Sequence, residues 1–480
     1  MSGLAVAGLG FCAMLIMIAL RAPIGLAMLI VGSAGYALLS GPAAYFGYMK
    51  TNAYHQFANY TLSVIPLFIL MGALAERAGI ATDLFKAAER VFGRTRGGLA
   101  MAVIGACTAF GAICGSSAAT TATFGRAALP ELLRHRYDGG LATGTIAVGG
   151  TLGILIPPSV ILVVYAISTE QNIAKLFQAA LFPGLLAAVL YCLVIRVVVR
   201  RHPRLAPLDP RMELAPVRRS RWQPVLAAAG LVAVAAAALY GRIGLSVASI
   251  LTAGVLLLAL VELAILPALT IALVVVGGIY GGVFTPTEGA AVGAIAMLAA
   301  GVLRGTLSAA DVTAALRQTA ETSGMIFIIL LGAEVFGAFL ALTRVPTVAA
   351  EAIGALGYSP FVVLVAMLAF YIALGAVMDE LAMILLTLPV FFPIVQALDF
   401  GMPPDDVAIW FGILVLIVVG IGLTAPPIGL NVFVISSIAS TIPIATTYRS
   451  VLPFLVADVL RLSLVVAFPG MALWLVRLLN

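Results

Sequence analysis

The chain has 480 residues, of which 63% are apolar and only 10% are charged. Many apolar runs exceed the ~18 residues that a helix needs to cross a bilayer, so the composition excludes a soluble protein. The formal net charge of +6 is typical of basic cytoplasmic loops and does not indicate a nucleic-acid partner. The four cysteines lie in apolar segments without metal-ligand spacing. The sequence therefore predicts an all-α, multi-pass membrane protein.

Apolar runs divide the chain into two series of equal length. The first series predicts spans at 2–20, 23–40, 57–78, 98–125, 139–168 and 177–199. The second series predicts spans at 265–284, 288–303, 322–343, 360–398, 409–438 and 449–478. We therefore expect two repeats, at 1–200 and 263–480. Between them we expect a basic cytoplasmic linker at 201–222 and an extra pair of transmembrane helices at 223–262.

A degenerate motif with a proline pair occurs in each series. The copy at 150–159 contains Pro157-Pro158, and the copy at 420–431 contains Pro426-Pro427. A proline pair breaks a membrane helix, because it removes backbone donors and clashes with the preceding turn. The motif therefore predicts broken helices at 139–168 and 409–438. Paired interruptions in two halves indicate a transporter built from inverted repeats.

Basic residues predict the side of the membrane from which each hairpin enters. The run 98–125 is preceded by Lys86, Arg90, Arg94 and Arg96 and followed by Arg126, Arg134 and Arg136. Both ends should then be cytoplasmic, so we expect a re-entrant hairpin with its tip near Cys114–Ser117. The counterpart at 360–398, with its tip near Gly375–Glu380, has mostly acidic or neutral flanks and should enter from the periplasm.

Several smaller features have a structural interpretation. The segments 81–94 and 346–356 are predicted to be short amphipathic connectors that each precede a hairpin. Glu288 follows a Thr-Pro-Thr turn and is interpreted as a helix-capping or interface residue and not as an ion ligand. Asp458 and Arg461, one helical turn apart, are expected to form an ion pair. The three histidines fall in predicted loops or at membrane surfaces, so a histidine proton relay is not expected.

The two hairpin tips and two helix breaks are the expected site of function. Irregular backbone at membrane depth persists only where it is buried in protein or lines a wet cavity. Free carbonyls with Ser, Thr and Asn oxygens suit Na⁺, whereas helix N-termini suit a carboxylate. Serine and threonine hydroxyls in membrane helices also bond back to their own helix, which is the structural alternative. Asp379 and Glu380 stand out because acidic groups at bilayer depth are costly.

Six stretches of the chain resemble the large membrane subunit of tripartite ATP-independent periplasmic (TRAP) transporters. They are 115–130, 137–144, 149–159, 277–288, 385–389 and 422–433. The resemblance covers nearly the whole chain and places the protein in a bacterial inner membrane. Two features depart from the family: the helix pair at 223–262, and Asp379-Glu380 where the family usually has Asp-Gly.

The resemblance implies a secondary transporter, not an enzyme, that imports an organic acid by an elevator motion of the hairpin-containing domain against a scaffold. It implies Na⁺ as coupling ion, with a small four-helix membrane subunit and a periplasmic substrate-binding protein as partners and lipid around the spans. The implied Na⁺ ligands are Ser116, Ser117, Thr120, Gly150 and Thr151 in one site, and Asp379, Thr424, Pro426 and Asn431 in the other. The implied substrate contacts are Ser117, Pro157, Pro158, Ser159, Pro427 and Asn431.

Two other functions are compatible with parts of this pattern. A stand-alone Na⁺/dicarboxylate symporter of similar architecture would need no binding protein. An intramembrane enzyme could use Ser116 of the Gly115-Ser116 pair as a nucleophile, but it would need a general base. No histidine or lysine lies in a predicted span, so the sequence favours a transporter.

Overall fold

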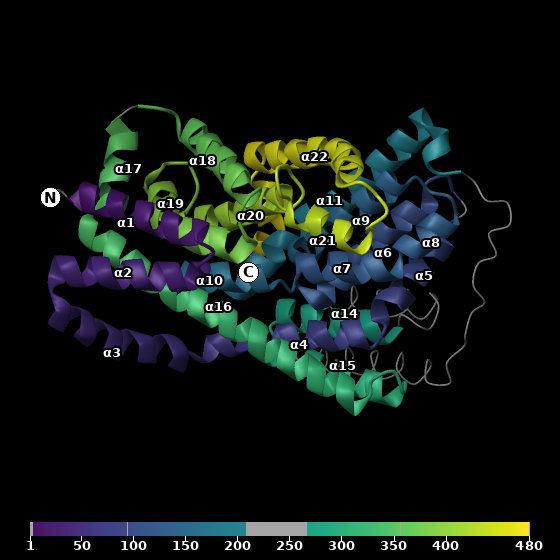
Figure 1. Ribbon diagram of the computed structural model, residues 1–480, viewed down its shortest axis with the longest axis horizontal. Coiled ribbons are helices and arrows are strands. Elements are labelled where there is room, and N and C mark those ends of the chain that lie inside the picture. Colours follow the sequence, from purple (N-terminus) through teal and green to yellow (C-terminus); the bar gives the residue numbers. More distant parts are fainter. Residues whose placement is uncertain (1–2, 94, 208–265, 356, 480) are drawn as a thin grey trace.

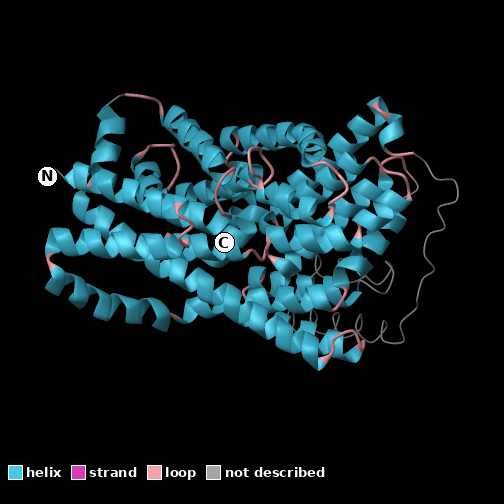
Figure 2. Ribbon diagram, viewed as in Figure 1, coloured by secondary structure: helices cyan, strands magenta, loops and turns pink. Residues whose placement is uncertain are grey.

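The computed structural model describes residues 3–93, 95–207, 266–355 and 357–479, and this part of the chain consists of helices joined by turns (Figures 1 and 2). Seven of its helices are long and apolar enough to cross a membrane, or eight if one bent pair is a single span. The multi-pass, all-α prediction is therefore confirmed. The extra helix pair predicted at 223–262 lies outside the described residues, as does the predicted linker beyond residue 207.

The described helices follow the predicted order. The first half contains α1 (Gly3–Ala19), α2 (Ile24–Ser40), α3 (Pro42–Ala58), α4 (Val64–Arg77), α5 (Ile80–Phe92), α6 (Gly98–Cys114), α7 (Ser117–Ala127), α8 (Leu129–Arg134), α9 (Gly139–Leu155), α10 (Val160–Ser168) and α11 (Ile173–Arg201). The second half contains α14 (Leu266–Tyr280), α15 (Pro286–Leu303), α16 (Ala309–Thr343), α17 (Val345–Ala355), α18 (Pro360–Gly375), α19 (Glu380–Ala397), α20 (Pro404–Gly422), α21 (Leu430–Ile438), α22 (Ile444–Ala467) and α23 (Gly470–Leu479). Helices α6 and α7, and α18 and α19, occupy the segments predicted as re-entrant hairpins, and α9 and α10, and α20 and α21, occupy those predicted as broken helices.

Three boundaries differ from the prediction. Helix α3 was not predicted, because its sequence has no continuous apolar run and buries none of its residues. Helix α16 begins 13 residues before the predicted 322, at a capping box formed by Ser308 and Asp311. The last predicted span, 449–478, is wrong as a single helix. It is divided into α22 and α23 at Phe468-Pro469, because proline has no backbone N–H to continue α22.

Glycines hold the outer helices α2 and α16 together. A Cβ atom added at Gly25 would lie 2.8 Å from the Ile329 backbone, and one added at Gly32 would lie 2.7 Å from the Phe336 backbone. The two helix backbones therefore approach more closely than larger residues would allow, as is usual between membrane helices. Helix α4 packs against both α15 and α16, which extends this group along the lower side in Figure 1.

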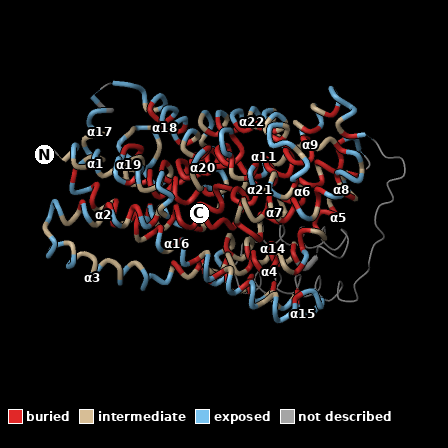
Figure 3. Tube along the Cα trace, viewed as in Figure 1, coloured by how far each residue is buried: buried red, intermediate tan, exposed pale blue. Residues whose placement is uncertain are grey.

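Helices α9 and α20 form the buried centre of the molecule (Figure 3). Residues 140–155 of α9 and 407–422 of α20 are all buried. Their sequences differ, because α9 is rich in glycine and threonine whereas α20 is a nearly continuous Ile, Leu and Val run. The small side chains of α9 let neighbours approach its backbone, so polar groups of other helices can reach it.

The two halves make corresponding contacts across the centre. Helix α7 of the first hairpin packs against α21, and α19 of the second hairpin packs against α10. Likewise α9 packs against α22, and α20 packs against α11. Each broken helix thus contacts elements of the other half. The opposite orientation of the two repeats in a membrane stays a prediction.

Candidate ion and substrate site

The tip of the first hairpin is a tight turn between α6 and α7. Gly115 ends α6 with a φ of 63°, a conformation that favours glycine. Ser116 then caps α7, since its Oγ accepts a hydrogen bond from the Ala119 amide (3.4 Å). Thr120 Oγ1 donates to the Ser116 carbonyl (2.7 Å). Ser117 and Thr120 are fully buried, so these hydroxyls lie inside the protein.

The first helix break lies directly against this tip. Helix α9 ends at Leu155, and a cis Pro157-Pro158 bond precedes the start of α10. Ser159 is fully buried and caps α10, with its Oγ accepting from the Leu162 amide (3.5 Å). A Cβ atom added at Gly115 would lie 2.9 Å from the Pro158 carbonyl oxygen. The starts of α7 and α10 are therefore side by side.

The second hairpin and second break have a similar arrangement. Helix α20 ends at Gly422, a cis Pro426-Pro427 bond follows, and α21 begins after Gly429, which has a φ of 52°. The amides of Ile428 and Gly429 donate to the carbonyl of Ala376 at the hairpin tip (3.2 and 3.4 Å). The second break is thus tied to its own hairpin by backbone hydrogen bonds.

Asn431 joins the two halves at these breaks. Its Nδ2 donates to Ser117 Oγ of the first hairpin (2.7 Å) and to the Ala147 carbonyl of α9 (3.0 Å). Ser117 Oγ in turn donates to Asn431 Oδ1 (3.0 Å). Asn431 and Ser117 are both fully buried, although they lie 314 residues apart in the chain. The structure therefore brings together these two predicted residues.

Gly150 and Thr121 complete this buried polar cluster. A Cβ atom at Gly150 would overlap Thr121 Oγ1 and lie 3.1 Å from Asn431 Nδ2. Thr121 Oγ1 is buried and has no hydrogen-bond partner within the described part of the chain. Thr121 is a candidate site residue that the predicted ligand set lacks, and its place beside Thr120 at the tip is the signal that could have found it. Its oxygen therefore keeps lone pairs that could ligate a cation.

Three predicted ligands use their hydroxyl hydrogen elsewhere. Thr120 donates to Ser116, Thr151 donates to the Val148 carbonyl (2.7 Å), and Thr424 donates to the Ile421 carbonyl (3.1 Å). Each of these hydroxyls therefore bonds to a nearby backbone carbonyl, as serine and threonine often do in membrane helices. A hydroxyl that donates its hydrogen keeps lone pairs that can ligate a cation, so the contacts do not exclude these residues from an ion site.

The acidic pair at the second tip has divided roles. Asp379 caps α19, with Oδ2 accepting from the Ala382 amide (3.3 Å). Glu380 is buried, and its Oε2 has no hydrogen-bond partner among the described residues. Glu380 is thus not solvated, and no described arginine pairs with it. A buried carboxyl with an oxygen that has no partner, beside a helix break, is a candidate for function.

A buried ion pair stabilises the back of the first break. Arg461 Nη2 lies 2.9 Å from Asp458 Oδ1, and both side chains are almost completely buried, which confirms the predicted pair. Tyr191 of α11 donates its hydroxyl to Asp458 (2.8 Å) and lies 3.3 Å from Thr151 Oγ1. Thr151 is therefore held by this network and has no hydrogen bond to the Asn431 cluster. The capping role predicted for Glu288 is also confirmed.

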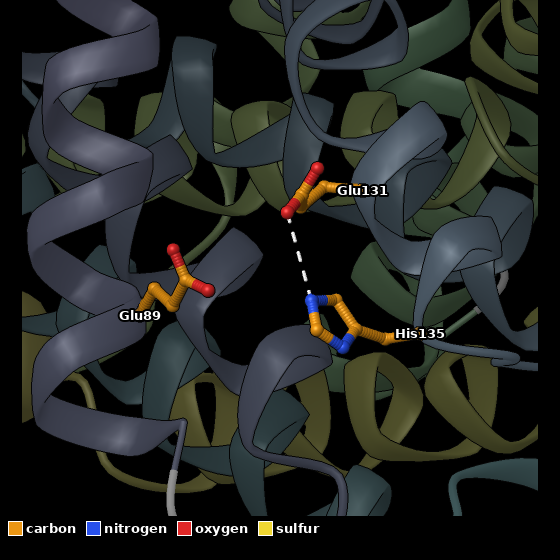
Figure 4. A group of neighbouring side chains, drawn as sticks. All are labelled: Glu89, Glu131 and His135. Atoms are coloured by element: carbon orange, nitrogen blue, oxygen red, sulfur yellow. Dashed lines mark ion pairs between the residues drawn. The ribbon is translucent and has the colours of Figure 1, made fainter. Parts of the chain in front are cut away.

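A second polar cluster lies at the opposite end of α7 from the hairpin tip. Figure 4 shows Glu89 of α5 facing Glu131 and His135, which are paired with an Oε1–Nε2 distance of 3.5 Å. The three ligand atoms lie within 4.8 Å of one another, a spacing that a divalent cation could use. Burial raises the pKa of Glu89, and the charge of Glu131 adds to this effect. This cluster is separate from the Asn431 cluster.

A protein-family comparison identifies the architecture that carries these sites. The model of the family described as "Tripartite ATP-independent periplasmic transporter, DctM component" matches residues 11–471. The chain belongs to this family. It is the permease component of a tripartite transporter and a multi-pass protein of the inner membrane. The resemblance noted in the sequence motifs is thereby confirmed.

Relatives of this permease carry related names. The chain is 33% identical to the C4-dicarboxylate TRAP transporter large permease protein DctM of Pseudomonas aeruginosa, covering 86% of each chain. It is 28% identical to the sialic acid permease SiaM of Vibrio cholerae, covering 88% and 87%. It is 29% identical to the ectoine permease TeaC of Halomonas elongata, covering 86% of each. All three are TRAP transporter large permease proteins by name.

The fold also resembles that of a solved structure whose sequence is only distantly similar. The YdaH transporter of Alcanivorax borkumensis superposes with a TM-score of 0.63, covering 95% of this chain and 98% of its own. The sequence identity is 15%, so this likeness concerns the fold alone.

Proposed function

We propose that this permease imports an organic acid that a periplasmic binding protein delivers, and that inward Na⁺ flow drives the import. A small four-helix membrane subunit would be the third component. The observation that carries the proposal is the Asn431 cluster, which joins the first hairpin tip to the second helix break. A site shared between the two halves is what a transporter with internal repeats requires.

The cluster has suitable chemistry for Na⁺. Its oxygens come from Ser117, Thr121, Asn431 and the carbonyl of Ala147 in α9, and the carbonyl of Leu423 accepts from the Asn431 amide. These are neutral oxygen ligands in a setting closed to bulk water, and they suit a hard monovalent cation. In the second half, the carboxylate of Asp379 and the oxygen of Thr424 would serve a second ion.

The substrate carboxylate would bind where helix starts converge. Helices α7 and α10 begin next to each other, with the Val160 amide 3.4 Å from the position of a Cβ atom at Gly115. Two helix N-termini give a region of positive potential that favours an anion. Ser117 and Ser159 add hydroxyl donors there. The C4-dicarboxylates, sialic acid and ectoine named for the relatives all carry carboxyl groups, which agrees with such a site.

Movement would follow the division between central and outer helices. The connectors α5 and α17 pack against α6 and α19, respectively, and each precedes a hairpin in the chain. In an elevator motion, the hairpins and broken helices would travel as one body against α2, α4, α15 and α16. The connectors would then absorb the change in backbone angles.

Transport by a reconstituted system tests the proposal. Proteoliposomes with the permease and its small subunit would be given radiolabelled C4-dicarboxylate, sialic acid or ectoine under an inward Na⁺ gradient, with and without the binding protein. We expect uptake of one substrate that requires both the binding protein and Na⁺. Uptake without the binding protein would instead indicate a stand-alone symporter. Uptake unchanged when K⁺ replaces Na⁺ would contradict Na⁺ coupling.

A further inference from the structure

An apolar groove lies between α5, α6 and α11, away from the hairpin tips. Its volume is about 820 Å³, which is within the range of ligand-binding sites. Its apolar walls include Phe92, Met101, Ile104, Val189 and Leu193. Val189 and Leu193 are about half exposed, with 56% and 51% of their surface accessible. The groove is therefore an open, apolar surface groove along three helices.

Three arginines form one end of the groove. Arg96 precedes α6, whereas Arg196 and Arg200 lie in the last turns of α11. All three side chains are exposed, and none has an acidic partner within residues 3–93, 95–207, 266–355 and 357–479. Three uncompensated positive charges at the edge of an apolar surface indicate an anionic ligand.

The remaining polar groups of the groove are already satisfied. Thr95 Oγ1 donates to the Phe92 carbonyl (2.9 Å), and Thr108 Oγ1 donates to the Ile104 carbonyl (2.8 Å). The groove therefore offers few hydrogen bonds to a polar metabolite along its length. A suitable ligand has a negative head and a long apolar tail, which is the chemistry of a phospholipid.

We propose that this groove binds an anionic phospholipid. Its phosphate would lie among Arg96, Arg196 and Arg200, and one acyl chain would lie along α6 and α11. The arginine end is continuous with the basic linker predicted to be cytoplasmic, and the cytoplasmic leaflet is the one that carries anionic lipids. Because the groove also includes the end of the α5 connector, the lipid would brace α5 against the first arm of the hairpin.

Native mass spectrometry of the purified permease, titrated with phosphatidylglycerol or phosphatidylcholine, tests the head-group preference. The variant Arg196→Gln/Arg200→Gln should bind phosphatidylglycerol roughly 25-fold more weakly, at about five-fold for each arginine beside an anionic head group. The matched control is Arg201→Gln/Arg204→Gln, which removes the same charge from exposed neighbours outside the groove. Equal weakening in both variants, or equal affinity for both lipids, would overturn the proposal.

Cys192 lines the groove, so the rate at which its thiol is labelled can be used to measure whether the groove is occupied. Cys107 and Cys114 are buried, so maleimide labelling of a Cys12→Ser variant would follow Cys192 alone. Phosphatidylglycerol should slow this labelling, and glycerol phosphate, which has the same head group without the chain, should not. Equal protection by glycerol phosphate would reduce the site to an anion site. Protection by the small subunit without added lipid would show that a protein covers the groove.

Discussion

The two proline breaks arise from similar sequences but lie in different surroundings. Pro157 and Pro158 are buried beneath the tip of the first hairpin, whereas Pro426 and Pro427 are exposed. Neighbouring Ile428 is also exposed, at 44% of its surface. The second break is hydrogen-bonded to its hairpin tip through the carbonyl of Ala376. The same local signal therefore produces one closed and one open break.

Both breaks lie beside a close approach of two glycines, but the side chains around them differ in exposure. Gly111 and Gly153 let α6 and α9 approach, since a Cβ atom at Gly111 would lie 2.7 Å from the Leu152 carbonyl oxygen. At the second tip Gly375 and Gly422 likewise let α18 and α20 approach, since a Cβ atom at Gly422 would lie 2.7 Å from the Gly375 Cα, but Val377 remains 58% exposed. In the part of the chain that the structure describes, the first proline pair is covered and the second is exposed.

Closure of the first break should be the feature most sensitive to mutation. Gly115→Val would force a β-branched residue into a positive φ and push its Cβ against the Pro158 carbonyl. We expect uptake to be abolished and the melting temperature to fall. Gly79→Val is the matched control, because Gly79 has a φ of 74° but nothing within 4 Å of its Cβ position. Equal loss of uptake in both variants would attribute the effect to strain alone.

The contact between the halves should have the next largest effect. Asn431→Ala would leave the buried Ser117 hydroxyl and its surroundings without their hydrogen-bonding partner, at a cost of about 1–3 kcal/mol. We expect uptake to fall about ten-fold or more. Ser117→Ala and the double variant complete a cycle measured by uptake and thermal unfolding. Strictly additive effects would contradict a functional contact between Ser117 and Asn431.

A substitution at Asp379 can distinguish helix capping from ion binding at the second break. Asparagine caps helices as well as aspartate does, so Asp379→Asn should leave the melting temperature unchanged. Loss of the carboxylate charge should raise the Na⁺ concentration for half-maximal uptake roughly ten-fold, the factor that corresponds to about 1.4 kcal/mol. Glu288→Gln, which changes a capping acid on α15, serves as the control. An unchanged Na⁺ dependence would remove Asp379 from the ion site.

The smallest expected effect is the pH dependence of stability that Glu89 of α5 contributes. Its pKa is raised above the ordinary 4.5 by burial and by Glu131. The protonated form is therefore favoured by folding, and this stabilisation is present at low pH and lost as the pH rises through the raised pKa.

Glu89→Gln should remove this loss of stability. The variant should then melt on the order of 1–2 °C above the unsubstituted protein, and only above pH 4.5. Thermal unfolding between pH 4 and pH 8 would measure it. Glu321→Gln is a control, because the Glu321 side chain is 65% exposed. The same pH trend in both variants would contradict the assignment to Glu89.

The comparison also separates what could be predicted from what could not. Proline pairs, glycine turns and caps act within a few residues, and the helix ends at the proline pairs and the capping role of Glu288 agree with the sequence on that basis. The Asp458–Arg461 pair was predictable for the same reason, because one helical turn places the two side chains together. Helix α3 was missed because it presents no apolar run.

The sequence by itself determined the membrane class, the family and the places where helices break, since these depend on composition and on local backbone chemistry. Only the tertiary structure decided that Asn431 bonds to Ser117, that Thr121 rather than Thr151 lies beside them, and that one break is covered. Such relations join residues up to 314 positions apart and depend on the side from which each helix is approached. Local spacing does not encode that side, because it is set by how whole helices pack.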